Sequence, residues 1–314
     1  MASLVTPEQI LKASGSDLLR DLDLTDDELL FLLDLADEVK ASPRDYAHLL
    51  DGKALALLFE KPSLRTKLTF ELAIQQLGGS SVFIEGPIGV REPLKDVARN
   101  LDRWTDGIVA RVFAQSTVED LARWSSVPVI NALSDAYHPC QALADVQTIR
   151  ERFGRLNGLK LTFIGDGNNV AQSLMLSALR LGMDFALGCP QGYLPNPDIV
   201  SQAEGLSAVS GASLLITHDT VAAVRGAHAV YTDVWASMGQ EQEAVQRRKD
   251  FHGYQVNDEL FSEARNDAVF MHCLPAKRGE ETTDSIMEHE RSVVFQQAEN
   301  RLHAQKALLL MMLA

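Results

Sequence analysis

The chain has 314 residues, of which 46% are hydrophobic and 23% charged, which suits a globular protein of two domains with a sizeable core. Its formal net charge of −14 argues against nucleic acid or an anionic membrane as a partner, because both repel an acidic surface. Three cysteines are too few for a disulfide framework and favour a reducing compartment. With no membrane-length apolar run and no signal-like N-terminus, we expect a cytoplasmic protein.

Apolar runs of strand length alternate with longer helical patterns along the chain. The first series of expected strands comprises 54–59, 81–84, 107–113 and 128–133, and helices are expected between them at 66–77, 93–104 and 117–125. The second series comprises strands 161–167, 184–190, 213–217, 229–234 and 268–274. This alternation predicts an α/β fold of two doubly wound domains, each a mainly parallel sheet with helices on both faces.

A break that contains Gly and Asn, near 154–158, separates the two series. We therefore expect a first domain over 1–150, with the C-terminal helix 296–314 packed back on it, and a second domain over 151–295. Two helices are expected to link these domains. One begins at Pro139, since proline suits the first position of a helix, and the other is the C-terminal helix.

The segment KPSLRT follows the first expected strand and opens a helix. Ser63 is a good N-cap, and the backbone amides of a helix start are a ready site for phosphate. Arg65 and Thr66 would add hydrogen bonds to an anion. From these residues alone, an ordinary helix cap and an anion-binding loop both remain open.

Two more polar groups accompany strands of the same series. Arg111 lies inside the apolar run IVARVF, and His138 begins HPCQ at a strand-to-helix junction. Because ligands bind beyond the carboxyl ends of strands in α/β sheets, these groups could share one crevice with KPSLRT. A buried salt bridge for Arg111 and a helix cap for His138 explain the pattern equally well.

The second series carries three polar segments after its strands. GDGNN lacks the third glycine of a dinucleotide fingerprint, since Val170 stands there, and its asparagines suit either a polar ligand or a helix cap. DVWASMGQE is expected to be an exposed loop, and Cys273 in HCLP is either a ligand-facing thiol or a buried structural one. A zinc site from His138, Cys140, His272 and Cys273 is disfavoured, because their spacing does not match the usual ligand patterns.

Taken together, these segments resemble the aspartate/ornithine carbamoyltransferase family over nearly the whole chain. The matching segments, in the family's order, are FEKPSLRT, GVREPLKDVARNLDRW, HPCQALADVQT, GDGNNVAQS, YTDVWASMGQE, HCLPAKRGEE and AENRLHAQKA. The phosphate motif and HPCQ indicate the reaction class, and DVWASMG and HCLP mark the ornithine-using branch.

The resemblance implies a role for each matching residue. The residues implied to bind carbamoyl phosphate are Ser63, Leu64, Arg65, Thr66, Arg111, His138, Gln141, Cys273, Leu274 and Arg301. Those implied to bind ornithine are Asn169, Asp233, Ser237 and Met238. The implied catalytic set is Arg111, His138, Asp233 and Cys273. No metal and no cofactor is implied.

The implied reaction converts carbamoyl phosphate and L-ornithine into L-citrulline and phosphate, in arginine biosynthesis. The resemblance also implies a homotrimer, and it leaves open whether trimers assemble further. Two alternatives remain: carbamoyl transfer to another amine, such as putrescine, an acylated ornithine or aspartate, and a non-catalytic relative that binds carbamoyl phosphate.

Two positions depart from the family's pattern. Lys67 stands where members commonly have arginine, and lysine cannot reproduce a bidentate fork. Near Pro87, many relatives carry a glutamine that reaches a neighbouring subunit's site, and Arg91 is a candidate substitute for it.

Overall fold

The computed structural model describes Ile10, residues 17–237 and residues 239–314. The chain divides into two compact units, one of Met1–Gln147 with Glu299–Ala314 and the other of Thr148–Ala298. The division falls inside two long helices, α6 (Pro139–Phe153) and α13 (Val294–Leu313). Each unit is built on a parallel sheet with helices on both faces, which confirms the predicted fold class.

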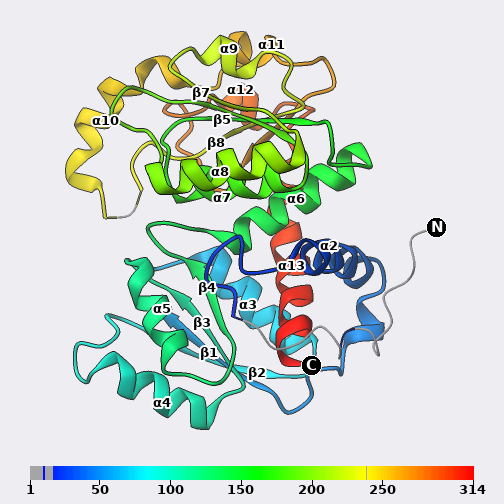
Figure 1. Cartoon of the computed structure of the whole chain (residues 1–314), viewed down its shortest axis with the longest axis vertical. Coiled ribbons are helices and arrows are strands. Elements are labelled where there is room, and N and C mark those ends of the chain that lie inside the picture. Colours follow the sequence, from blue (N-terminus) through cyan, green and yellow to red (C-terminus); the bar gives the residue numbers. More distant parts are fainter. Residues whose placement is uncertain (1–9, 11–16, 238) are drawn as a thin grey trace. The chain divides into compact units, whose positions relative to one another are not determined.

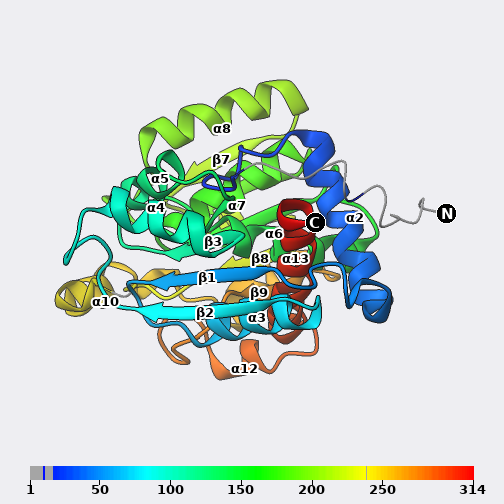
Figure 2. The same ribbon diagram turned by 90° about the horizontal axis from the view of Figure 1, so that it is seen from below.

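The first unit contains a four-stranded parallel sheet in the order β2-β1-β3-β4. Its strands are β1 (Ala54–Phe59), β2 (Ser80–Glu85), β3 (Gly107–Arg111) and β4 (Val129–Leu133). On one face, α4 (Leu94–Trp104) and α5 (Gln115–Arg123) bury apolar side chains against β1, β3 and β4. On the other, α3 (Leu64–Gln76) runs along β2 (Figure 2). The sheet is therefore covered on both sides.

Within residues 17–53, α2 (Asp26–Ala41) and the 3-10 helix η1 (Pro43–Tyr46) precede this sheet. Thr25 and Glu28 form a capping box at the start of α2, and its first turn carries acidic residues that suit the helix dipole. Six residues of α2 are buried along one side, so this helix packs into the core of the first unit.

The second unit contains a five-stranded parallel sheet in the order β7-β6-β5-β8-β9. Its strands are β5 (Lys160–Ile164), β6 (Asp184–Gly188), β7 (Leu214–Thr217), β8 (Ala229–Thr232) and β9 (Val269–His272). Figure 1 shows α7 (Asn169–Arg180) and α8 (Pro197–Ser210) on one side of this sheet. The other side carries α9 (Thr220–Val224), α11 (Asp258–Ser262) and α12 (Asp284–Met287), whose apolar residues share one core cluster. The remaining elements are η2 (Glu241–Glu243), α10 (Ala244–Asp250) and η3 (His252–Tyr254).

Several strands end earlier than the apolar runs predict. The strands expected over 107–113, 229–234 and 268–274 end at Arg111, Thr232 and His272. The reason is clearest after β9, where Leu274 has a φ of 58°, a left-handed conformation that cannot continue a strand. The apolar residues beyond each strand end therefore belong to loops.

The order of strands marks one position in each sheet where ligands bind. In an open parallel sheet, a crevice forms at the carboxyl ends where successive connections leave in opposite directions. That switch point lies between β1 and β3 in the first unit and between β5 and β8 in the second. KPSLRT follows β1 and Arg111 ends β3, whereas GDGNN follows β5 and Asp233 follows β8. These four polar groups thus lie at the two switch points, whereas HPCQ follows β4 and HCLP begins at the last residue of β9.

Among the residues that the structure describes, no helix is both long and apolar enough to cross a membrane.

Candidate active site

The start of α3 forms a capped helix end at the first switch point. Ser63 is the N-cap, and its Oγ accepts a hydrogen bond of 3.2 Å from the Thr66 N–H. Arg65 is half-buried in the first turn, and Leu64 is 69% exposed. The positive end of the α3 dipole therefore points to the carboxyl end of β1, where an anion is favoured. The structure confirms the helix cap at Ser63, and the anion site stays a prediction that the same geometry suits.

A buried row of side chains joins α3, α13 and α6. The Arg301 guanidinium donates from Nη2 to Thr66 Oγ1 at 3.2 Å and from Nη1 to Gln141 Oε1 at 2.6 Å. Gln141 in turn donates from Nε2 to Asp145 Oδ1 at 2.8 Å. All four residues are buried. The structure thus brings together three predicted residues, Thr66, Gln141 and Arg301, and adds Asp145.

His138 and Arg111 are buried in the same unit, at 5% and 6% exposure. Burial lowers the pKa of His138 well below its usual value, and the positive charges of Arg301, Arg111 and Lys61 lower it further. The imidazole is therefore neutral near pH 7. A neutral imidazole surrounded by cations can donate its N–H to a carbonyl oxygen without adding another charge.

Lys61 belongs to the same cluster of cations as Arg111 and Arg301, although the sequence motifs give it no role. It is 9% exposed, and its ammonium lies 4.5 Å from the centroid of the Phe113 ring. Burial and the charge of Arg111 lower the pKa of this lysine. The sequence feature that could have indicated a role for Lys61 is its position between the buried strand β1 and the Ser63 cap.

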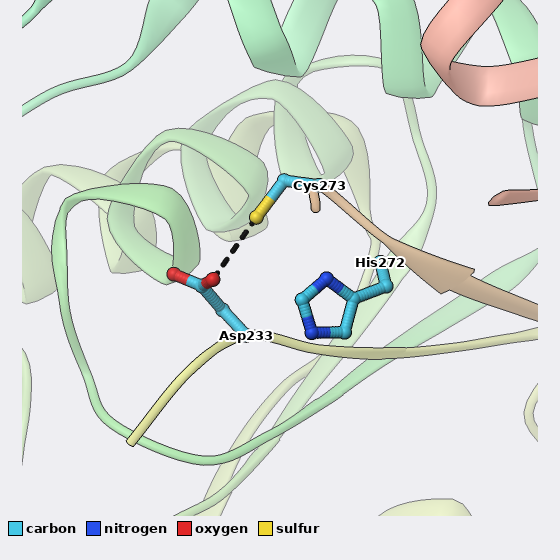
Figure 3. Close-up of side chains that lie close together, drawn as sticks. All are labelled: Asp233, His272 and Cys273. Carbon is cyan, nitrogen blue, oxygen red and sulfur yellow. Dashed lines mark hydrogen bonds between the residues drawn. The ribbon is translucent and has the colours of Figure 1, made fainter. Parts of the chain in front are cut away.

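Asp233 is the centre of the polar group in the second unit (Figure 3). Its Oδ1 accepts a hydrogen bond of 3.1 Å from the Cys273 thiol, and its Oδ2 accepts one of 3.1 Å from Asn168 Nδ2. Asn168 is also the N-cap of α7, with its Oδ1 accepting from the N–H groups of Val170 and Ala171. Asn168 therefore both caps α7 and orients Asp233.

His272 and Glu281 form a fully buried pair behind Cys273. His272 Nδ1 accepts the Leu274 N–H at 2.8 Å, so its proton lies on Nε2, which donates to Glu281 Oε1 at 3.2 Å. The same carboxylate oxygen accepts the Lys277 N–H. The pair thus holds the turn that contains Cys273 and Leu274. The sequence motifs suggested His272 only as a zinc ligand and gave no role to Glu281.

The ligand atoms of Asp233, His272 and Cys273 lie within 4.8 Å of one another, a spacing that could hold a metal ion. However, both ring nitrogens of His272 are engaged in hydrogen bonds, and the Cys273 S–H donates a hydrogen bond to the Asp233 carboxylate. For Cys140, burial raises the pKa to about 12, and its thiol donates to the Asn131 carbonyl. These side chains already use their polar atoms in hydrogen bonds with one another and with the backbone, which makes them a poor donor set for zinc.

Asn169 and Ser237, two other predicted residues of the second unit, follow the two strands of the same switch point. Asn169 begins α7, and its Oδ1 accepts the Val170 N–H at 2.9 Å. Ser237 is half-buried in the loop after β8, where its N–H donates to Gln240 Oε1 at 3.0 Å. Met238 lies outside the described residues.

The two units have opposite chemistry at their switch points. The first presents buried cations at a helix start, which suits a phosphorylated compound. The second presents a carboxylate beside a thiol, which suits an amino compound. The two groups of side chains, one in each unit, are suited to one ligand that carries a phosphate and another that carries an amine, which is the class of two-domain α/β protein to which the geometry points.

Comparisons with known proteins narrow this class. The family model "Aspartate/ornithine carbamoyltransferase, carbamoyl-P binding domain" matches residues 16–151, and "Aspartate/ornithine carbamoyltransferase, Asp/Orn binding domain" matches residues 157–312. The chain therefore belongs to the aspartate/ornithine carbamoyltransferase family.

Individual relatives agree with this assignment. The chain is 50% identical to an ornithine carbamoyltransferase of Oceanobacillus iheyensis, over 96% of this chain and 95% of the relative. It is 48% identical to the "Ornithine carbamoyltransferase, anabolic" of Pyrococcus furiosus, over 96% and 97%. A solved ornithine carbamoyltransferase structure from Pyrococcus furiosus superposes with a TM-score of 0.93 and covers 96% of this chain and 97% of its own.

Proposed function

We propose that the protein is an ornithine carbamoyltransferase, which transfers the carbamoyl group of carbamoyl phosphate to the δ-amine of L-ornithine. The products are L-citrulline and phosphate, and the reaction serves arginine biosynthesis. The observation that carries this proposal is that the family's motif residues coincide with the two topological switch points, Ser63–Thr66 and Arg111 at one, and Asp233 at the other.

In the proposed reaction, the first unit binds carbamoyl phosphate. The phosphate is held by Ser63, Leu64, Arg65, Thr66 and Arg301. The buried guanidinium of Arg301, fixed by Thr66 and Gln141, supplies positive charge with little reorganisation as the phosphate leaves. Arg111 and His138 contact the carbonyl oxygen, and the neutral imidazole donates its N–H as negative charge develops there.

The amide of carbamoyl phosphate is held by Gln141 and by the backbone carbonyl of Leu274, with Cys273 assigned to the same ligand through the HCLP motif. Gln141 suits this role because its side chain is fixed between Arg301 and Asp145. The turn at Leu274 suits it because the His272–Glu281 pair holds the backbone in a left-handed conformation.

The second unit binds ornithine in this proposal, through Asn169, Asp233, Ser237 and Met238. A δ-amine resembles that of lysine, whose pKa is about 10.4, and so it is mostly protonated at pH 7. It must lose its proton before it attacks the carbonyl carbon. Asp233 attracts the cationic substrate, and the Cys273 thiol, which is tied to Asp233, lies beside the reacting amine.

We assign residues 1–150, with the C-terminal helix 296–314, to a carbamoyl-phosphate-binding domain, and residues 151–295 to an ornithine-binding domain. The family models that match each half carry these ligands in their descriptions. A cytoplasmic location is proposed with this assignment, because the three cysteines carry thiols.

We further propose that the protein assembles as a homotrimer. Support comes from a row of exposed apolar side chains along α3 and the edge strand β2, namely Leu64, Leu68, Leu72, Val82 and Ile84. Apolar side chains gathered on a sheet edge and its neighbouring helix are typical of a surface that another chain covers. Light scattering of the purified protein measures the assembly directly, and a monomer would contradict this proposal.

The central experiment measures citrulline formed by the purified protein from carbamoyl phosphate and L-ornithine. The controls are Arg65→Ala and Cys273→Ala, and no citrulline above these controls would overturn the proposed function. Replacing ornithine by putrescine, an acylated ornithine or aspartate tests the rival amines. Tight calorimetric binding of carbamoyl phosphate without any turnover would instead indicate a non-catalytic relative.

A further inference from the structure

Arg247 is a buried cation in the second unit to which neither the motifs nor the proposed mechanism gives a role. It lies on α10, a short helix that follows the loop containing Ser237, and its side chain is only 8% exposed. Burying a guanidinium is costly unless its donors are satisfied. The question is therefore what this helix holds in place.

The Arg247 side chain connects α10 to Asp166, Tyr193 and Trp235, which lie in three other segments of the chain. Its Nη1 donates to Asp166 Oδ2 at 2.5 Å and to the backbone carbonyl of Trp235 at 3.0 Å. Its Nε donates to Glu243 Oε2 at 2.9 Å. The guanidinium also lies over the Tyr193 ring, with Arg247 Cζ 4.9 Å from the ring centroid.

Two of these contacts belong to the loops of the switch point. Asp166 lies in GDGNN, two residues before Asn168, which orients Asp233. Trp235 lies two residues after Asp233 and two before Ser237. Trp235 is 6% exposed, and its ring stacks on Phe251 at a centroid distance of 5.9 Å. Arg247 thus fastens one end of the Ser237 loop to the loop after β5.

We infer that Arg247 is a positioning residue for the amino-acid substrate. It holds the backbone at Trp235 so that Asp233 and Ser237 keep one arrangement, and it does so without touching the substrate. This inference rests on the proposed function for the identity of that substrate, ornithine.

The chemistry of the pair explains why an arginine is needed. Burial raises the pKa of the Asp166 carboxyl, and the hydrogen bond from Arg247 opposes that rise. One guanidinium reaches Asp166, Trp235 and Glu243 at once through a rigid planar fork. A lysine ammonium is a single point of charge and cannot span all three acceptors in that geometry.

The kinetic test compares Arg247→Gln and Arg247→Lys with Arg248→Gln, a matched control one residue away whose side chain is 52% exposed. We expect Arg247→Gln to raise the KM for ornithine roughly tenfold or more, because small misplacements of a binding loop are costly. The KM for carbamoyl phosphate should stay within about twofold, as for the control. Arg247→Lys should rescue only part of the loss.

A second variant separates positioning from stability. Arg247→Gln alone leaves the Asp166 carboxylate, which is 13% exposed, without its cation, whereas Asp166→Asn with Arg247→Gln removes both charges. The double variant should recover most of the melting temperature that the single variant loses, while the KM for ornithine stays high. If the KM for ornithine returned to the wild-type value with stability, or never changed, the inference would be wrong.

A readout that needs no turnover tests the same contact. The chain has three tryptophans, so replacing Trp104 and Trp124 by phenylalanine leaves Trp235 as the sole tryptophan. In that background, Arg247→Gln should increase quenching of Trp235 by acrylamide, and Arg248→Gln should not. Unchanged quenching would contradict the fastening of the loop. Absence of citrulline in the wild-type protein would instead refute the proposed function and leave this measurement decisive for the loop.

Discussion

The charged and polar side chains near the two switch points are stabilised in different ways. In the first unit, cations are buried near one another, and His138 is kept neutral by burial and by Arg301, Arg111 and Lys61. In the second, acidic groups are held by hydrogen bonds from specific neighbours: Asp233 by Cys273 and Asn168, Glu281 by His272 and the Lys277 N–H, and Asp166 by Arg247. The overall charge of −14 therefore says little about ligands, because local clusters of opposite sign determine what each unit can bind.

The difference also predicts how each region fails. A site built from clustered cations loses ligand binding when one cation is removed, because the charge itself binds the anion. A site held by buried hydrogen-bonded pairs loses stability or geometry first, because the removed partner leaves the other group unsatisfied. Each of the following changes tests one side of this comparison.

The largest effect is expected for Arg301→Met in the first unit. This change removes a buried guanidinium that contacts both Thr66 and Gln141, together with the charge that it brings to the proposed phosphate site. We expect kcat/KM for carbamoyl phosphate to fall by about 10³, equivalent to about 4 kcal/mol of transition-state stabilisation. Steady-state citrulline kinetics measure it, with the exposed Arg123→Met as a control. A loss below tenfold would remove Arg301 from the proposed site.

The second unit should respond through stability to Glu281→Ala. The change leaves the buried His272 Nε2–H and the Lys277 N–H without their acceptor. We expect the free energy of unfolding to fall by about 1–3 kcal/mol in urea titrations. Glu281→Gln retains an acceptor oxygen and should lose less, and Glu280→Gln, at the neighbouring half-buried position, should behave like the wild type. Equal stability of Glu281→Ala and the wild type would show that the pair does not hold the turn.

The cationic cluster of the first unit should also make the stability of the protein depend on pH, through the buried His138. The pKa of His138 is well below its ordinary value of 6.5 in the folded protein, so below that pH the unfolded chain takes up a proton that the folded chain does not. His138 therefore contributes a loss of stability as pH falls from about 6.5 toward its folded pKa, at most about 1.4 kcal/mol per pH unit.

The measurement compares urea unfolding of the wild type and His138→Gln between pH 7.5 and 5. The variant lacks this titrating group, so its stability should fall less steeply over that range. Parallel curves would show that His138 titrates normally and that the cationic cluster does not depress its pKa.

How much of this could be read from the sequence depends on the distance between partners. The strands, the Ser63 cap and the position of His138 at the start of α6 follow from local patterns, because apolar periodicity and caps involve neighbouring residues. Arg301 meets Thr66 across 235 residues and Gln141 across 160, and Arg247 meets Asp166 across 81. No local pattern encodes such pairs. Thr66, Gln141 and Arg301 were predicted through family motifs, whereas Asp166, Glu281 and Arg247 were not.

The smallest effect is expected at Lys67, the departure from the family's arginine. Its ammonium lies 3.8 Å from the centroid of the Phe83 ring, so the charge is held on β2 beside α3 rather than in the row of Thr66 and Arg301. An arginine can stack on the same ring through its planar head. Lys67→Arg should therefore change kcat/KM for carbamoyl phosphate by no more than about twofold. Lys67→Met should lower stability slightly and leave turnover close to that of the wild type. A tenfold change in kcat/KM with either variant would mean that Lys67 belongs to the anion-binding cluster, and the first switch point would then extend to the side of α3 that faces β2.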